Sequence, residues 1–328
     1  MSFKPFPILR LPQLAQEEAM KQMRSTDNFT LALTSARTQN MVKVILSRYK
    51  YELLLVDSRC WFGPESNMET ESYFDIGDMK TFDKDCVKFG RQVDETKVRK
   101  FLKGVRNTFE KYTLNLDIKS SYLVILLSSS IKSLNFKVNR VEIETDAGTD
   151  AETYHISLIG FTNASHLGLR TRKPAYFHGT NLPVYDFDRV YIQDASWVTE
   201  RDVYEKFWNC KHVKMDNCDF DSDKNLVYPI VEKWIEGSKL ERLSLRSDNE
   251  DCFGFVPSVL GGIPFKAKKQ VRSLYNDIYK RREITFNYGY EVKRNDKEAL
   301  VVCVDEIESD CLMARDFTVD NTNTFEEW

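Results

Sequence analysis

The chain has 328 residues, of which 42% are hydrophobic and 30% are charged, and its 47 basic and 50 acidic side chains give a formal net charge of -3. This near balance excludes an overall basic nucleic-acid binder and a disordered acidic protein. The length predicts about two domains. The longest apolar run, residues 122–127, is much shorter than the roughly 20 residues that cross a bilayer, so we expect no membrane partner.

The cysteines and the first residues bear on the compartment. The seven cysteines are scattered along the chain, and no two of them form a CxxC pair. Residues 1–10 contain no sustained apolar segment and are interrupted by Pro5 and Pro7, unlike a secretory signal. We therefore expect a reducing compartment, either the cytoplasm or the nucleus.

Residues 1–50 are predicted to form a small helical unit. One short amphipathic helix follows Pro12, and the polar residues 25–28 are expected to interrupt the chain before a second helical stretch. The apolar positions of the two helical stretches are Ala15, Ala19, Met20 and Met23, followed by Leu33, Ala36, Met41, Val44 and Ile45. Residues 51–93 are expected to form a connecting strand and a loop.

A repeated pattern begins at about residue 94 and predicts an irregular leucine-rich-repeat-like β/α solenoid over residues 94–310. Its unit is a short strand with two apolar residues on one face, followed by a segment that is usually helical. First members of the pairs are 20 to 33 residues apart, and such spacing is typical of leucine-rich-type repeats. The six pairs are Leu114/Leu116, Leu134/Phe136, Leu167/Leu169, Val190/Ile192, Val213/Met215 and Leu243/Leu245.

The segments between these strands carry helix signals. Residues 98–109 have apolar side chains at helical spacing, and Thr199 and Asp223 are placed to cap two later helices. Pro229 is compatible with the last of these helices if the helix begins near it, and Gly237 is a stop signal. Because helices connect the strands, we expect the strands to be parallel.

The C-terminal part is predicted to differ from the repeats. A basic stretch from Lys266 to Arg282 is expected to be a helix, and strands follow at residues 283–287, 290–294 and 299–305. The last two strands are expected to form a β-hairpin, and residues 311–328 are expected to be a tail.

The sequence shows no motif for nucleotide binding, for a serine hydrolase or for a zinc protease. Cys210, His212 and Cys218 lack the paired ligand spacing of a zinc site, and the acidic residues near Asp216 fail the calcium-loop pattern in both registers. We therefore predict no metal, no cofactor and no catalytic residue. An enzyme with a dispersed site that uses Asp216 and Asp219 stays open as an alternative.

The N-terminal residues resemble an F-box in residues 6–12 (FPILRLP), 14–23 and 31–42. The rest of the chain resembles the type 2 F-box-associated domain of nematode F-box proteins, through residues 234–243 and the hairpin at residues 289–296. Gln13, Gln16 and Ala19 depart from the larger apolar residues that an F-box usually has, and Lys297 replaces the usual turn glycine.

This resemblance implies an α/β fold with an N-terminal F-box, and it implies a function. The chain would be the substrate-recognition subunit of an SCF-type cullin–RING ubiquitin ligase, bound to a Skp-type adaptor and through it to a cullin. A leucine-rich-type interaction scaffold with no link to ubiquitin is the alternative. The residues implied in adaptor binding are Pro7, Ile8, Leu9, Leu11, Pro12, Leu14, Met20 and Leu33.

A protein substrate is expected to bind the outward side chains of the solenoid strands, which lie between the apolar pairs. Tyr191 is the expected anchor, since tyrosine is enriched at binding hot spots. The competing site is the C-terminal hairpin with Tyr290 and Arg294. The predicted substrate-binding residues are Asn115, Asn135, Tyr191, Lys214 and Ser244, which show no consistent charge, together with Gly168 in the same pattern.

Overall fold

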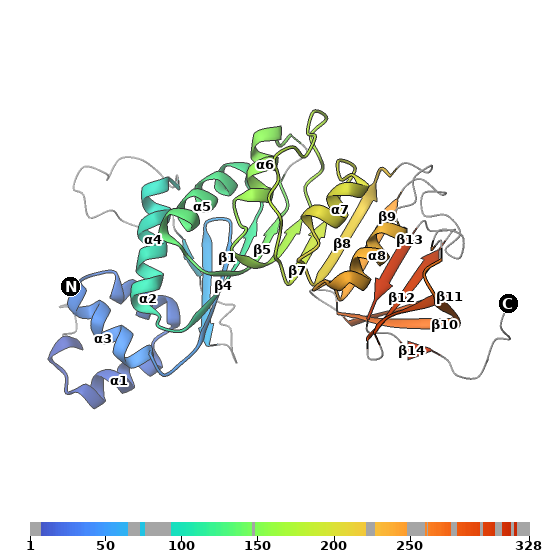
Figure 1. Cartoon of the computed structure of the whole chain (residues 1–328). Helices are drawn as coiled ribbons and strands as arrows, with labels where there is room; N and C mark the ends of the chain where they lie inside the picture. The colour runs from blue at the N-terminus through green and yellow to red at the C-terminus, as the bar shows by residue number, and fades with distance from the viewer. Residues whose placement is uncertain are drawn as a thin grey trace. The chain divides into compact units, whose positions relative to one another are not determined.

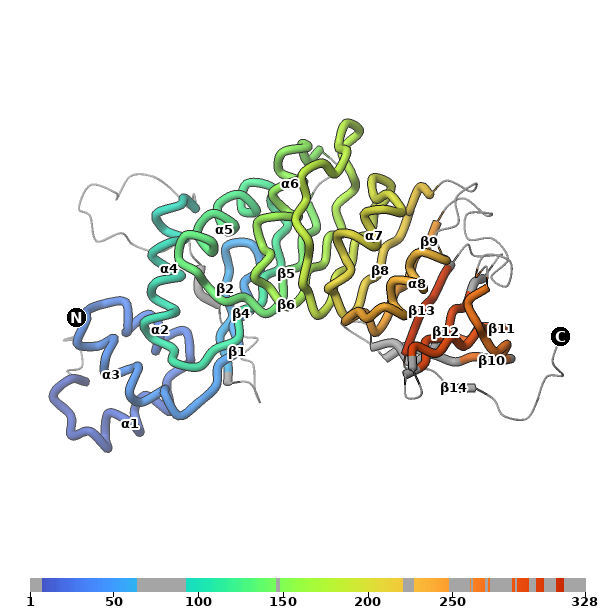
Figure 2. Tube along the Cα trace, in the orientation of Figure 1, coloured from blue at the N-terminus to red at the C-terminus, as the bar shows by residue number. Residues whose placement is uncertain are grey.

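The computed structural model consists of two compact units, Met1–Thr145 and Asp146–Trp328 (Figures 1 and 2). The chain is α/β, with an N-terminal helical region followed in each unit by parallel strands to which antiparallel strands are added. No helix in the described part of the chain is long and apolar enough to cross a membrane. The structure describes residues 8–64, 73–75, 93–145, 148–220, 227–247, 260, 262–276, 281–295, 298–305, 310–315 and 318–319.

The N-terminal region is helical, as predicted. A 3-10 turn, Ile8–Arg10, precedes α1 (Gln13–Gln22), α2 (Ser25–Ala32) and α3 (Ala36–Leu46). The predicted stop and restart at residues 25–28 is confirmed in part, because α1 ends at Gln22 and residues 25–28 form the first turn of α2. The next break falls at Ser35, whose hydroxyl accepts a hydrogen bond from the Thr38 amide at 3.2 Å and caps α3.

The first unit continues with a five-stranded sheet and two helices. Strand β1 lies parallel to β4, and β4 lies parallel to β5, while β2 and β3 add to β1 in antiparallel order. The bounds of these elements are β1 Tyr51–Val56, β2 Arg59–Pro64, β3 Tyr73–Asp75, α4 Glu95–Thr108, β4 Tyr112–Ile118, α5 Ser121–Leu134 and β5 Val138–Ile143.

The N-terminal helices share one core with this sheet. The ring of Phe29 in α2 lies 4.8 Å from Phe62 in β2, 5.7 Å from Phe101 in α4 and 5.9 Å from Phe109, measured between centroids. All four side chains are at most 1% exposed. The segment 1–50, which the sequence separates from the rest, is therefore held by contacts to residues that follow it.

The predicted strand at Leu134/Phe136 is wrong. Leu134 is the last residue of α5, and Asn135 follows with φ 48° and ψ 51° in the left-handed region. Asparagine adopts this conformation at a helix end more readily than most residues do. The alternating sequence Leu134-Asn135-Phe136 therefore belongs to the end of a helix and not to a strand. The strand of this repeat is β5, in which Val141 and Ile143 are buried.

The second unit begins with α6 (Ala151–Ile159) and four parallel strands (Figure 1). Five of the six predicted apolar pairs lie in strands, one in β4 and four here, and every member is at most 3% exposed. The prediction of parallel pairing is confirmed within each unit. The elements are β6 Ala164–Leu169, β7 Arg189–Ile192, α7 Glu200–Lys206, β8 His212–Cys218, α8 Val227–Gly237 and β9 Arg242–Ser247.

The helix signals of this unit are confirmed in part. Thr199 caps α7, accepting a bond from the Asp202 amide at 3.2 Å, whereas Asp223 lies outside the described residues. Pro229 falls in the first turn of α8, where its missing N–H has no partner to lose, and Gly237 ends the helix with φ +120°. Between β6 and β7 no helix forms, and buried aromatic rings fill this layer instead.

The C-terminal region differs most from its prediction. The basic stretch expected to be helical is strand β10, which pairs antiparallel with β11 from Phe265–Val292 to Asn276–Arg281. Two predicted strands are the single strand β11, while the β11/β12 hairpin is confirmed. The expected tail contains β13, which pairs with both β12 and β9. The strands are β10 Phe265–Asn276, β11 Arg281–Asn295, β12 Glu298–Asp305, β13 Asp310–Ala314 and β14 Thr318–Val319.

Burial explains the mistake about the tail. Cys311, Leu312, Met313 and Ala314 are all at most 2% exposed, so both faces of β13 are covered and its sequence lacks the alternation of a half-exposed strand. On one face, Leu312 and Ala314 join a cluster with Val271, Phe286, Val301 and Cys303 from β10, β11 and β12.

Candidate binding surface

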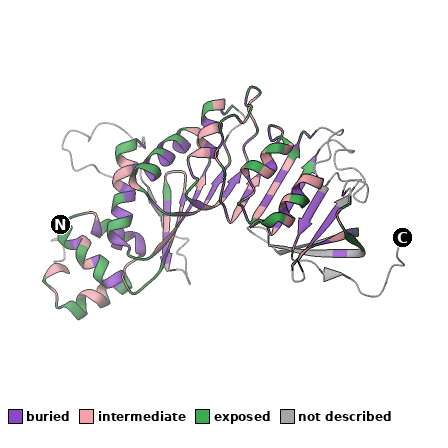
Figure 3. Cartoon of the chain, viewed as in Figure 1, coloured by how far each residue is buried: buried purple, intermediate pink, exposed green. Residues whose placement is uncertain are grey.

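The four parallel strands of the second unit have one apolar and one polar face. Helices α7 and α8 lie over one side of these strands (Figures 1 and 3), and the burial of the alternating apolar pairs indicates that their side chains point to that side. Because side chains alternate along a strand, the residues between and beside the pairs point the other way. We call this side of β6–β9 the outward face. Its middle row consists of Gly168, Tyr191, Lys214 and Ser244, which are aligned in register.

Tyr191 lies at the centre of a set of polar contacts on the outward face. Its hydroxyl donates a hydrogen bond to Asp216 Oδ2 at 2.9 Å. The guanidinium carbon of Arg170 and Nζ of Lys214 are each 5.2 Å from the centroid of its ring, within cation–π range. Lys214 Nζ is also 3.8 Å from Asp216 Oδ2. Residues from three strands therefore form one side-chain cluster.

The rows on either side of this middle row contain basic residues. One row contains His166, Arg189, His212 and Arg242, aligned along the amino-terminal part of the strands. The other row lies along the carboxyl-terminal part of the strands, where each residue follows the second member of a buried pair. It consists of Arg170, Gln193, Asp216 and Arg246. Asp216 is the one carboxylate among the twelve positions. The sequence-based expectation of a face without consistent charge holds only for the middle row.

Three of the five predicted substrate-binding residues meet on the outward face, and two do not. Tyr191, Lys214 and Ser244 are neighbours in register. Asn115 belongs to the first unit and is 6% exposed; its amide donates to Glu52 Oε1 at 2.7 Å and its carbonyl accepts from Asn139 at 2.9 Å. Asn135 is exposed but lies at the end of α5, outside any strand.

The competing site at the hairpin is tied to its own unit. The guanidinium of Arg294 lies 5.1 Å from the Trp234 ring of α8 and donates to the Ser238 carbonyl at 3.3 Å. The Tyr290 ring meets Phe265 edge-on at 5.5 Å. These contacts give both residues a role in packing β11 against α8 and β10.

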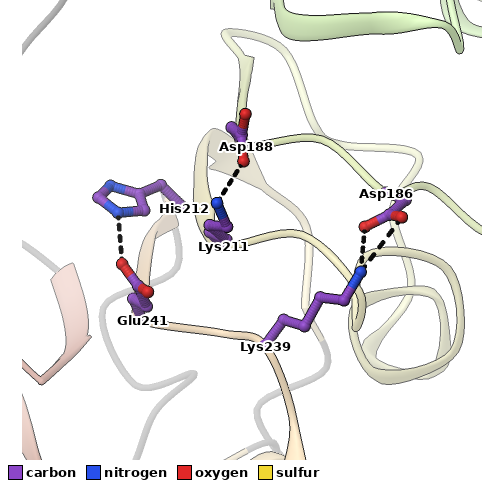
Figure 4. A network of polar contacts seen from close by, with 6 residues as sticks. All are labelled: Asp186, Asp188, Lys211, His212, Lys239 and Glu241. Atoms are coloured by element: carbon purple, nitrogen blue, oxygen red, sulfur yellow. Dashed lines mark hydrogen bonds and ion pairs between the residues drawn. The ribbon is translucent and has the colours of Figure 1, made fainter.

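A second polar cluster lies where the strands begin (Figure 4). Lys211 pairs with Asp188 at 2.6 Å, Lys239 with Asp186 at 2.9 Å and His212 with Glu241 at 3.2 Å. The first four of these residues border a pocket of about 440 Å³, together with Thr162, Asn163, Ala164, Ser165 and Phe187. The pocket sits at the amino ends of parallel strands, whereas open α/β sheets bind ligands beyond the carboxyl ends.

One ion pair of this pocket, Asp188 with Lys211, is held in its ionised form. The hydrogen bond from Lys211 lowers the pKa of Asp188, and the same bond raises the pKa of Lys211. A general acid or base needs a pKa moved toward neutrality, which is the opposite change. The Asp188–Lys211 pair is therefore not suited to proton transfer. Both ion pairs hold the loop before β7 against the starts of β8 and β9.

The thiols near this cluster are core residues. Cys210 and Cys218 are at most 2% exposed, and burial raises the pKa of Cys210 to about 12. His212 faces Glu241 rather than either thiol. Among the described residues no group of three or more His, Cys, Asp or Glu side chains could hold a metal ion.

The residues implied in adaptor binding fall into three groups. Pro12 and Leu14 are exposed, Leu14 at 77%, and Ile8, Leu9 and Leu11 are half-buried. Met20 is 1% exposed, so its side chain belongs to the core and offers no surface to a partner. Leu33 is half-buried beside Gly104 of α4, and Pro7 lies outside the described residues.

Sequence reasoning missed the basic rows and Val44. The rows follow once the strand register is known, because each row residue lies next to a recognised apolar pair. Val44 was expected on the apolar side of its helix but is 61% exposed.

Comparisons with protein-family models, curated proteins and solved structures found no match to this chain.

Proposed function

We propose that this chain is a non-catalytic substrate receptor of an SCF-type cullin–RING ubiquitin ligase. Its N-terminal helical region binds a Skp-type adaptor, and the outward face of β6–β9 binds a protein target. Such a receptor acts by holding a target near a reactive group carried by another subunit, so binding replaces chemistry in this chain.

The observation that carries this proposal is the exposure of apolar side chains on the N-terminal helices. Leu14 of α1 is 77% exposed and follows the exposed Pro12 in the segment that resembles an F-box, and Val44 of α3 is 61% exposed. Large exposed apolar groups that cluster in one region mark interaction sites. Here they lie on helices that are fixed in the core by other residues, Met20 in α1 and Val42 in α3.

Two further observations support a binding role. The polar pocket at the amino ends of β6–β9 contains charged groups whose pKa values are moved away from neutrality. The five described cysteines, at positions 60, 210, 218, 303 and 311, are buried thiols, as expected for a protein of the reducing cytoplasm or nucleus.

Co-purification with a Skp-type adaptor tests the proposal. Leu14→Glu places a charge where the partner would bury an apolar side chain worth about 1.5–3 kcal/mol, so we expect adaptor affinity to fall by about tenfold or more. The double variant Leu11→Ala with Pro12→Ala should also lose adaptor binding. Because Leu14 is largely exposed, the Leu14→Glu variant is expected to fold normally.

Tyr176→Glu is the matched control, since Tyr176 is 87% exposed in the second unit. This variant should retain the adaptor. If the unaltered chain fails to bind the adaptor, the ubiquitin-ligase proposal is wrong and the scaffold alternative stands. If Leu14→Glu and the double variant both bind as well as the control, the N-terminal surface is not the adaptor site.

A further inference from the structure

The loop that joins β6 to β7 presents the most exposed large hydrophobic side chain of the described residues. Tyr176 in this loop is 87% exposed, whereas the adjacent Phe177 is 5% exposed. Tyrosine is enriched among the residues that dominate binding energies. A single exposed ring is common on protein surfaces, so its role depends on how the surrounding chain is held and charged. We call residues 172–178 the Tyr176 loop.

Phe177 anchors the loop directly beside Tyr176. Its ring meets those of Tyr154 in α6 and of Trp197 edge-on, with centroids 4.7 and 5.4 Å apart. Its amide donates a hydrogen bond to the Pro174 carbonyl at 3.0 Å, which closes a four-residue turn with Tyr176 at the third position. The exposed ring therefore stands on a closed turn whose last side chain is part of the core.

Contacts on both sides of this turn fix the loop further. Asp194, just beyond β7, accepts hydrogen bonds from the Lys173 amide and the Ser196 hydroxyl at 2.9 Å each. Gly179 has φ +60°, and a Cβ atom there would overlap the Trp197 ring, so the chain passes directly against this ring. A surface loop that is already held in place loses less conformational freedom when a partner binds. Tyr176 is thus presented in a preorganised position.

The charge beside the exposed ring is positive. Residues 170–185 contain no Asp or Glu, although the chain as a whole has a net charge of -3. Arg172 is exposed and Lys173 is half-buried, and neither forms an ion pair with any residue that the structure describes. The carboxylate of Asp194 uses both oxygens to hold the loop. Two cations beside Tyr176 therefore favour a ligand of negative charge.

The arrangement of these cations favours separate carboxylates over one phosphate group. A residue that precedes proline, as Lys173 does, prefers an extended backbone, and neighbouring side chains of an extended backbone point to opposite sides. Arg172 and Lys173 are therefore expected to diverge, whereas a phosphate is bound by cations that converge on it. A nucleic acid would need a longer basic surface than this loop provides.

We propose that the Tyr176 loop binds a segment of a target protein in which Asp or Glu residues flank an apolar side chain. The ring of Tyr176 packs on the apolar side chain, and Arg172 and Lys173 pair with the carboxylates. The ties to Asp194 and Trp197, which follow β7, put the loop at the carboxyl ends of β6 and β7, where open α/β sheets bind ligands. This inference rests on the proposed receptor function and specifies the chemistry of its target.

Fluorescence anisotropy with labelled peptides tests the inference on the full chain. The probe is the peptide Ser-Asp-Ser-Glu-Leu-Glu-Ser-Asp-Ser. A second peptide has Asn and Gln in place of the acids, and a third has Ser in place of Leu. The probe should bind, the amide peptide should not, and the peptide without Leu should bind more weakly than the probe. Binding of the probe should weaken at high salt, because exposed charges are screened.

Variants of the loop give the decisive comparison. Tyr176→Ala should weaken binding of the probe by about tenfold or more, as expected for a hot-spot residue. Its control is Val184→Ala, which truncates a side chain that is 56% exposed before β7 and should leave binding unchanged.

Neutralising the two cations tests the role of charge. Arg172→Gln with Lys173→Gln should weaken binding by about fivefold, since exposed ion pairs are individually weak. Lys103→Gln with Lys137→Gln makes the same change in net charge at exposed positions of the first unit and should leave binding unchanged. All substituted side chains are exposed or half-buried, and an unchanged urea midpoint checks that each variant is folded.

Each contrary outcome has a definite meaning. The inference is wrong if the probe does not bind, if Tyr176→Ala binds it as tightly as Val184→Ala does, or if both double variants weaken binding equally. It is also wrong if a singly phosphorylated peptide or a single-stranded oligonucleotide of similar length binds more tightly than the probe. Adaptor co-purification is measured on the same samples. Retained adaptor with no peptide binding overturns only this inference, whereas peptide binding without adaptor overturns only the ligase proposal.

Discussion

At the scale of single residues, Gly289 of β11 leaves the least room for a side chain among the described glycines whose φ is not positive. A Cβ atom at this position would lie 2.7 Å from Val271 Cγ2 and 2.8 Å from both Cys303 Sγ and Val301 Cγ2. Three strands, β10, β11 and β12, meet there in the buried cluster. The absence of a side chain at residue 289 is what allows these strands to approach.

Gly289→Ala should therefore destabilise the protein. Overpacking of a well-packed core costs about 1–3 kcal/mol, and the neighbours are short β-branched or sulfur-bearing groups with little freedom to move. The loss should appear as a lower midpoint in urea. Gly148→Ala is the control, because a Cβ there meets nothing within 4 Å. Equal stability of the two variants would contradict the close approach of β10, β11 and β12.

The ion pair between Asp188 and Lys211 should make stability depend on pH. The pKa of Asp188 is lowered in the folded state by the bond from Lys211, so the pair contributes stability above the unfolded carboxyl pKa of about 3.9 and loses it as pH falls through the lower folded value. Both side chains are 47% exposed, so solvent screening keeps the contribution of the pair to stability small.

Asp188→Asn is expected to lower the urea midpoint slightly at pH 7, and the difference from the unaltered chain should shrink progressively as the pH falls below about 3.9. High salt should reduce the difference at pH 7 in the same way. Asp219→Asn, at an exposed position at the end of β8, serves as the comparison. A difference that persists undiminished at pH 3 would mean that Asp188 acts through packing rather than charge.

At the scale of elements, the strands with one buried and one polar face could be predicted from the sequence. Leu167/Leu169 and Val213/Met215 alternate with polar residues because only one face of each strand meets the helices. Strands of the C-terminal region could not be found in this way. Strand β13 is buried on both faces and reads as a short apolar run, and β10 is a basic segment whose pairing with β11 overrides any helical spacing.

The candidate site shows the same limit. Tyr191, Lys214 and Ser244 were found because each lies between two recognised apolar residues. Asn135 was wrongly assigned to a strand, because the left-handed residue that ends α5 stands between two apolar residues, as a residue of a half-buried strand would. The basic rows required the alignment of four strands separated by loops of different lengths, and no periodicity in the sequence records that alignment.

At the scale of the molecule, the chain divides between Thr145 and Asp146, whereas the sequence suggests divisions near residues 50, 93 and 310. The strand–helix pattern continues past residue 145, so no change of composition marks the division. Conversely, residues 1–50 look like a separate module but are joined to α4 and β2 through Phe29. Long-range packing, which the sequence does not display, sets both boundaries.

The two units should respond separately to core mutations. Phe29→Ala removes a fully buried ring from the first unit at a cost of about 3–5 kcal/mol, and should increase hydrogen exchange in α4 and β1 while β8 and β12 keep their protection. Ile230→Ala, in the fully buried face of α8, should give the reverse pattern. A uniform loss of protection across both units in either variant would show a single cooperative unit.

The position of β13 has a consequence for the order in which the chain is made. Strand β9 ends at Ser247, and its neighbour on that side begins only at Asp310, about 60 residues later. At about 5–20 residues per second, a ribosome leaves this edge without its partner for several seconds. An unpaired edge can recruit strands of other chains. Messages truncated before codon 310 are therefore expected to yield aggregates, even though they encode all the parallel strands.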